Sequence, residues 1–152
     1  MVADWQFNTC FTFDWIILPI YITFTNNIIA SNIRKTLEKT EVPENSKIVD
    51  SIEIVGKISG NGNGMQYFGA ILLESDLSEL ELNEHYRKYR DNEWSFLVTK
   101  QNSSTINVID KLGYKFKNYD ESKKDKYYIV YSWDSSKKVF LLDILELDIR
   151  GH

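Results

Sequence analysis

Two apolar runs on either side of a glycine-rich turn dominate the hydrophobic pattern of this chain. In the first run, 48–58, isoleucines recur at even positions, the two-residue period of a strand with one buried face. The second run, 65–73, is apolar at both odd and even positions, which is typical of a central strand. The turn between them, 60–64, contains two Asn-Gly pairs, and both residues tolerate the positive φ of tight hairpin turns. The pattern predicts an antiparallel hairpin at the centre of a sheet.

The alternation of apolar residues also predicts the register of this hairpin. A two-residue turn at Asn61-Gly62 places three pairs of residues opposite each other: Ile58 and Met65, Gly56 and Tyr67, and Ile52 and Ile71. A turn at Asn63-Gly64 has the same parity and stays open as an alternative. In the first register Gly56 faces Tyr67, and we expect the tyrosine ring to cover the strand backbone that glycine leaves bare.

A helix is expected before the hairpin and another after it. Asn26 or Asn27 is a suitable N-cap for a helix over 28–40, which ends ahead of Pro43. After the hairpin, Ser78 and Glu81 form the capping-box pattern of a second helix. Apolar residues around this second helix form its hydrophobic staple and buried stripe: Leu77, Leu82, Tyr86 and Tyr89.

The rest of the chain predicts more strands. We expect strands at 94–99 and 127–133, a loop over the polar run 118–126, and either helix or strand over 139–149. The order helix, hairpin, helix, strands predicts an α+β domain: an antiparallel sheet built around the central Asn-Gly hairpin, with two or three helices on one face.

The N-terminal segment stands apart from this domain. Residues 1–25 form an apolar segment, and residues 26–152 form a single α+β domain. The apolar run 15–24 is shorter than the roughly 20 residues that a membrane-spanning helix needs, and no Lys or Arg precedes Arg34, so the basic start of a signal peptide is missing. Two interpretations stay open: a degenerate membrane anchor, or a segment packed on the core.

Composition and charge exclude several function classes. A formal net charge of -4 gives no overall attraction to nucleic acid, so no nucleic-acid partner is expected. The single cysteine rules out an internal disulfide, and neither histidine has neighbours at metal-ligand spacing, so we expect no metal and no cofactor. Acidic residues around 74–84 are explained by the start of the second helix, which negative charge stabilises. No nucleophile and base stand at a recognisable spacing, so the chain is not expected to be an enzyme.

Three stretches also carry a resemblance: PENSKIVDSIEIVGKISGNGNGMQYFGAILLESDLSELELNEHY, YYIVYSW and DIRGH. With them, the region from about Leu37 to His152 resembles a family of small, functionally uncharacterised proteins of Gram-positive bacteria. Similar proteins tend to begin with an apolar anchor and to place the following domain outside the membrane. The resemblance therefore implies a membrane-associated, extracytoplasmic domain, and it implies no catalytic residues.

These observations lead to one expected function and two alternatives. We expect a non-catalytic binding or interaction domain displayed at the membrane through residues 15–24, with an unidentified protein or a small polar ligand as its partner. The alternatives are a cytoplasmic, immunity-like partner-binding protein that uses its acidic face, and a small hydrolase that uses a C-terminal cluster. The candidate binding residues lie in the hairpin and in the tail: Asn61, Asn63, Tyr67, Asp148, Arg150 and His152.

Overall fold

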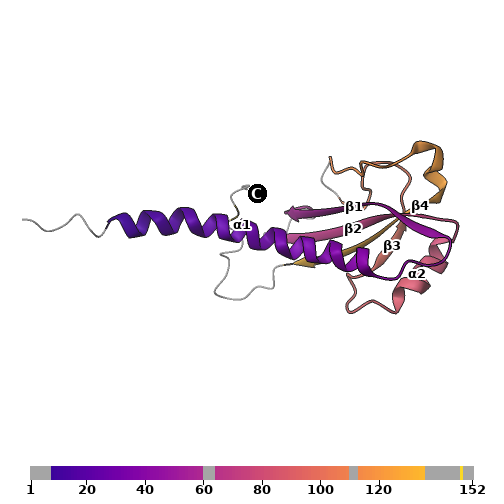
Figure 1. Ribbon diagram of the computed structural model, residues 1–152, viewed down its shortest axis with the longest axis horizontal. Helices are drawn as coiled ribbons and strands as arrows, with labels where there is room; N and C mark the ends of the chain where they lie inside the picture. Colours follow the sequence, from indigo (N-terminus) through magenta and orange to yellow (C-terminus); the bar gives the residue numbers. More distant parts are fainter. Residues whose placement is uncertain (1–7, 60–63, 110–112, 136–147, 149–152) are drawn as a thin grey trace, which may run out of the picture.

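The fold is a helix-covered antiparallel sheet, as the sequence predicts. The computed structural model describes residues 8–59, 64–109, 113–135 and 148. Within them the strands form a four-stranded antiparallel sheet in the order β1-β2-β4-β3 (Figure 1). The elements, in chain order, are α1 (Asn8–Lys39), β1 (Ser46–Gly56), β2 (Gln66–Ser75), α2 (Glu79–Arg87), β3 (Leu97–Lys100), the 3₁₀ helix η1 (Glu121–Lys126) and β4 (Tyr127–Ser135). The predicted α+β class is confirmed.

The two faces of the sheet are covered by different parts of the chain. On the helix face, Leu37 of α1 and Leu82 and Tyr86 of α2 pack with Ile71 of β2. On the opposite face, the segment after β3 covers the sheet with three buried side chains: Ile106, Ile109 and Phe116. β2 is therefore buried on both faces, which explains why its sequence is apolar at odd and even positions alike.

The hairpin pairs as predicted, but its register and the position of β1 differ from the prediction. The structure sets Gly56 opposite Gln66, Val55 opposite Tyr67 and Ile52 opposite Ala70, so the predicted pairs are wrong by one residue. β1 lies at the edge of the sheet and β2 in its interior. The observed pairs have the opposite parity to the pairs that either predicted turn would give, and the turn residues 60–63 themselves lie outside the described part of the chain.

A β-bulge divides the first strand into two parts of opposite parity. The pairing shifts between Ile48 and Asp50. Even-numbered residues before the bulge therefore face one side of the sheet, and even-numbered residues after it face the other side. As a result Ile48 packs in the helix-face cluster, whereas Ile52 and Ile54 pack on the opposite face. The isoleucines of this run thus do not share one face, although parity alone predicted that they would.

The first helix is much longer than predicted. α1 runs without interruption through Asn26 and Asn27, so the expected N-cap there is wrong. The Asn26 side chain is fully buried and bonds to Tyr67 and Asp148 instead of capping a helix. Because these partners come from distant parts of the chain, the local sequence could not distinguish a cap from a tertiary contact.

The second helix begins as predicted. The Ser78 side chain accepts a hydrogen bond from the Glu81 N–H, and the Glu81 carboxylate accepts one from the Ser78 N–H, at 3.3 and 2.7 Å. The Ser78 hydroxyl also donates to the Glu81 carboxylate, and this bond, together with the one from the Ser78 N–H, lowers the pKa of Glu81. Leu77 packs against the cluster that contains Leu82, as expected for a hydrophobic staple.

The remaining elements match the prediction in part. β4 covers the expected strand, but the polar run expected as a loop contains η1, because the Asp120 side chain caps it by accepting a bond from the Ser122 N–H. β3 begins three residues later than expected, since Trp94 lies in a turn. The segment 139–149, expected as either helix or strand, lies outside the described residues except at Asp148.

Candidate functional site

An aromatic cleft of about 640 Å³ lies on the sheet face opposite α1 and α2. Its volume falls within the range of small-molecule sites. Three aromatic residues, Trp94, Tyr131 and Trp133, dominate its lining. The other lining residues come from the hairpin end, β3, β4 and two loops: Ser59, Gln66, Asn92, Leu97, Val108 and Asp134.

The floor of the aromatic cleft is fixed by the core beneath it. The Phe68 ring of β2 contacts Trp133 edge-on, with ring centroids 4.7 Å apart, and Tyr131 at 5.8 Å. Tyr131 is paired with Leu97 of β3, so these two side chains share the cleft face. Because Phe68 is fully buried, the two rings above it rest on a rigid base.

Trp94 forms the exposed wall of the cleft. Its side chain is 57% exposed, although its backbone is fixed: the N–H donates to Asn92 Oδ1 at 2.8 Å, and the carbonyl accepts from the Trp133 N–H at 2.8 Å. Two residues later, Phe96 has a left-handed φ of 50° and is buried against Tyr86 with nearly parallel rings. A bulky residue rarely adopts this conformation. The turn therefore directs one ring into the core and holds Trp94 at the surface.

The polar rim of the cleft is ordered by internal hydrogen bonds. The Gln66 amide oxygen accepts from the N–H groups of Ile58 and Ser59, both at 2.8 Å, and its nitrogen donates to the Ser59 carbonyl. Asp134 borders the cleft, but in the β2–β4 pairing it lies directly opposite Tyr67, which is on the helix face. Residues opposite each other in a sheet point to the same face, so the Asp134 carboxylate lies on the helix face as well. Among the described lining residues, the side chains directed into the cleft are thus uncharged.

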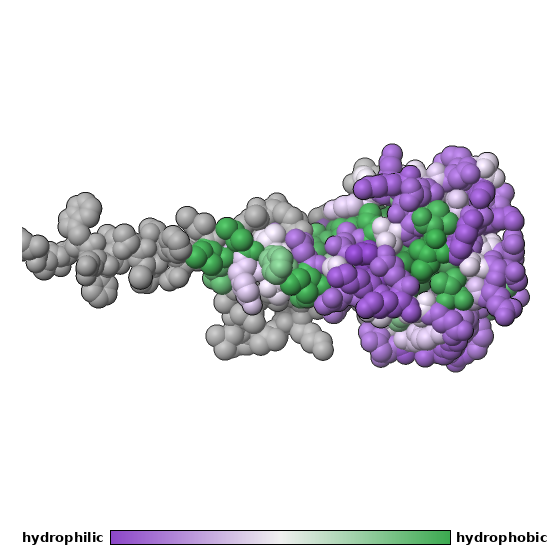
Figure 2. All heavy atoms as spheres, in the orientation of Figure 1, coloured by the Kyte–Doolittle hydropathy of each residue, from purple (hydrophilic) through white to green (hydrophobic). Residues whose placement is uncertain are grey.

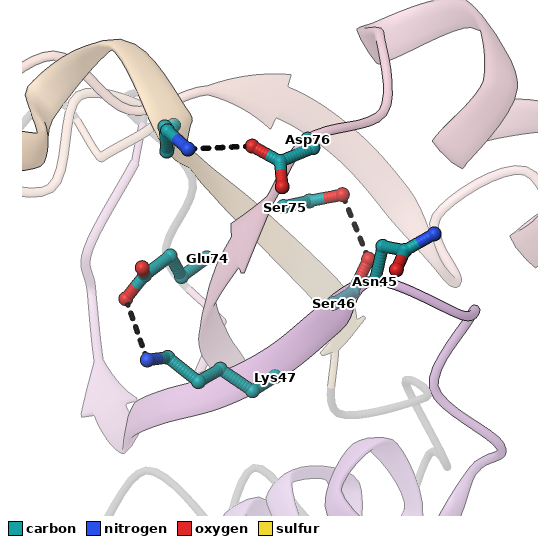
Figure 3. A pocket seen from close by; sticks show the side chains of 7 residues that line it. Asn45, Ser46, Lys47, Glu74, Ser75 and Asp76 are labelled. Carbon is teal, nitrogen blue, oxygen red and sulfur yellow. Dashed lines mark hydrogen bonds and ion pairs between the residues drawn. The ribbon is translucent and has the colours of Figure 1, made fainter.

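A second, polar pocket of about 260 Å³ lies where β1 begins and β2 ends (Figure 3). Its charged groups are already paired: Lys47 with Glu74 at 3.1 Å, and Lys126 with Asp76 at 2.6 Å. Burial of Glu74 opposes its ionisation, but hydrogen bonds from Lys47 and Lys123 outweigh it and lower the pKa of this carboxyl. Since these ion pairs would have to break for a charged ligand to bind, we regard the aromatic cleft as the better candidate.

The same pairings account for the acidic residues around the start of α2. Besides the pairs of Glu74 and Asp76, Glu79 accepts a hydrogen bond from the Lys100 N–H at 3.1 Å, and Glu84 lies 3.5 Å from Arg87. These carboxylates stabilise the fold locally, as the sequence suggested for this helix end.

Two of the candidate residues from the sequence lie together, in a buried chain of hydrogen bonds. Tyr67 donates from its hydroxyl to Asn26 Oδ1 at 2.8 Å, and Asn26 Nδ2 donates to the Asp148 carboxylate at 3.0 Å. All three residues are buried. Burial, and then the charges of Asp134 and Asp148, raise the pKa of Tyr67. These hydrogen bonds connect α1, β2 and Asp148, and they lie on the face away from the cleft.

The other candidate residues cannot be placed. Asn61, Asn63, Arg150 and His152 lie outside the described residues. His85 does not contribute to the cleft: its ring lies 2.9 Å from the Glu41 carbonyl and edge-on to Tyr86. Within the described part of the chain, no three potential ligands (His, Cys, Asp or Glu) lie close enough to hold a metal ion.

A further apolar surface runs along α1. It is the exposed stripe, formed by residues at three- and four-residue spacing on the side away from the sheet: Ile17, Ile20, Tyr21, Phe24 and Ile28. Figure 2 shows apolar side chains over the part of α1 that extends beyond the sheet. Among the helices that the structure describes, none has the length and apolar character required to cross a membrane.

Sequence reasoning did not identify the aromatic cleft. Its tryptophans stand 39 positions apart (133 minus 94), in a turn and in a strand, and each was read as an ordinary strand residue. The available signal was Trp94 directly after the polar run Arg90–Glu93. Comparisons with protein-family models, with curated proteins and with solved structures found no match for this chain.

Proposed function

We propose that this protein is a non-catalytic binding domain held at a membrane surface by the N-terminal half of α1, with the aromatic cleft as its binding site. The observation that carries the proposal is the exposed stripe. Ile20, Tyr21 and Phe24 are 55%, 65% and 63% exposed, and the N-terminal part of α1 projects past the sheet (Figure 1). Such a concentration of exposed apolar side chains is typical of an interaction surface.

The composition of the stripe is compatible with attachment at a bilayer interface. The stripe is continuous along one side of a helix and contains aromatic residues, as in helices that lie in the membrane interface. In addition, no Lys or Arg precedes Arg34, so this half of α1 has no basic residue with which to bind anionic surfaces. The attachment is therefore apolar, and we expect it to be insensitive to salt and to lipid charge.

The position of the cleft suits display at a surface. The exposed stripe belongs to α1, on the helix face of the sheet, whereas the aromatic cleft opens on the opposite face. A domain attached through α1 would thus keep the cleft accessible to a ligand in solution.

Vesicle flotation of the full chain tests the attachment. We expect the protein to float with both phosphatidylcholine and phosphatidylglycerol vesicles, at low and high salt. Replacing Ile20, Tyr21 and Phe24 with Ser removes about 1 kcal/mol of apolar transfer energy per residue, so binding should weaken about 100-fold. Leu80→Ser is the matched control, because Leu80 is 80% exposed on α2, outside the stripe.

Two results would contradict the proposal. In the first, the triple variant floats as well as the unchanged protein. In the second, sedimentation shows a dimer that the triple variant abolishes while vesicles bind neither protein; the stripe would then be covered by a second copy of the chain.

A further inference from the structure

We propose that the aromatic cleft binds a short neutral oligosaccharide, whose sugar rings stack on Trp94, Tyr131 and Trp133. This inference rests on the proposed function, since it names the ligand class of the binding site that the domain would display. It goes beyond that function because membrane attachment alone says nothing about what the cleft holds.

The aromatic rings provide the stacking surfaces. The face of an aromatic ring carries partial negative charge, and the flat side of a sugar ring presents C–H groups of the opposite polarity. Trp94 is open to solvent, whereas Trp133 and Tyr131 are supported from below by Phe68. Because the backbone carbonyl of Trp94 accepts a hydrogen bond from the Trp133 N–H, the wall and the floor of the cleft are held relative to each other before a ligand binds. A preformed site of this kind loses little side-chain entropy on binding.

The charge of the cleft favours a neutral ligand. Its described side chains are aromatic, aliphatic, hydroxyl or amide groups, and the one carboxylate at its border belongs to the helix face. A phosphate, a nucleotide or an acidic peptide would meet no cationic side chain among these lining residues, and its charge would lose hydration without compensation.

An extended peptide is disfavoured by the neighbouring sheet edge. A peptide in this position would gain affinity by pairing with β3. However, the Val98 carbonyl already accepts from Asn83 Nδ2 at 3.4 Å, and the Lys100 N–H donates to Glu79 at 3.1 Å. The edge of β3 is thus capped by side chains of α2, as natural sheets protect their edges.

Hydrogen-bonding groups remain for the hydroxyls of a sugar. The indole N–H groups of Trp94 and Trp133 and the hydroxyl of Tyr131 make no hydrogen bond within the part of the chain that the structure describes. Each of these groups ends a ring that lines the cleft, so one side chain can stack on a sugar ring and donate to a hydroxyl of the next. This combination of apolar ring faces and unused polar tips is what a neutral, hydroxyl-rich ligand requires.

Titration of the full chain with cellotriose and with tri-N-acetylchitotriose tests the inference. Both are neutral, and their β-linked rings present flat C–H faces. We expect saturable binding of at least one of them by calorimetry, together with a change in tryptophan fluorescence. Trp94→Ala should weaken this binding about tenfold or more without altering the fold, because the side chain is mostly exposed. Leu80→Ala is the control and should bind like the unchanged protein.

The outcomes separate this inference from the proposed function. If neither glycan binds in the millimolar range, or if Trp94→Ala binds as well as the unchanged protein, the saccharide inference is overturned. A polyproline peptide or tetramethylammonium that binds in a Trp94-dependent way in place of the glycans would overturn it too, while keeping the cleft as a binding site. If the full chain does not float with vesicles, the proposed membrane attachment is overturned, but the result of the glycan titration is unaffected.

Discussion

Gly69 is the position where the packing of α1 on the sheet can be tested most directly. A Cβ placed on Gly69 would lie 2.7 Å from the Arg34 backbone nitrogen and 2.7 Å from Ile33 Cγ2. Since ordinary contacts between such atoms are about 3.5–4.0 Å, α1 would have to move away from β2 by roughly an ångström. Overpacking of this kind costs about 1–3 kcal/mol, whereas replacing a strand glycine by alanine gains about 0.5–1 kcal/mol. We therefore expect Gly69→Ala to lower the free energy of unfolding by about 1–2 kcal/mol.

Urea unfolding followed by circular dichroism measures this loss, provided that the m-value stays unchanged. Gly69→Val supplies the decisive comparison: valine has the higher strand propensity but adds more volume beneath α1, so it should destabilise more than alanine. A double-mutant cycle with Ile33→Ala should show partial rescue, because it removes one of the two clashing groups and leaves the backbone contact of Arg34. If valine is better tolerated than alanine, or if the cycle shows no coupling, close packing of α1 on Gly69 is refuted.

Three further predictions concern single side chains. Burial raises the pKa of Tyr86 to about 12, whereas the ordinary pKa of tyrosine is about 10. The neutral phenol therefore contributes its full stabilisation below pH ~10, and this contribution is lost as the pH rises through ~12. Its hydroxyl has no hydrogen-bond partner within the described chain. Tyr86→Phe should therefore raise the free energy of unfolding by ~1 kcal/mol at pH 7 and reduce the loss of stability at alkaline pH. If the variant is less stable than the unchanged protein at pH 7, the hydroxyl does have a hydrogen-bond partner. Ser78→Ala should cost about 0.5–2 kcal/mol through the lost cap, and an unchanged melting temperature would contradict this. Asn26→Ala should lower the free energy of unfolding in urea by about 1–3 kcal/mol. Asn32 is exposed on the same helix, so the control Asn32→Ala should change stability by less than about 0.5 kcal/mol. Equal effects of the two substitutions would mean that the buried hydrogen bonds of Asn26 contribute nothing to stability.

Wherever the sequence predicted an element correctly, the signal was local. The capping box of Ser78 and Glu81 joins residues three apart, and both of its bonds form as expected. The two-sided apolar character of 65–73 predicted an interior strand, because burial on both faces removes the alternation of polar residues. The class of fold followed from these local signals and their order along the chain.

Tertiary structure decided what depends on residues far apart. A single bulge before Asp50 reversed the parity of the first strand, and no residue type in that run marks where a bulge occurs. Asn26 has the side chain of a helix cap, yet it lies inside α1 and accepts a hydrogen bond from Tyr67, 41 residues away. The aromatic cleft likewise depends on Trp94 and Trp133 meeting across the β3–β4 edge. The sequence by itself determined the local elements of this protein; the register, the length of α1 and the site were decided by contacts between distant residues, whose energies no local pattern encodes.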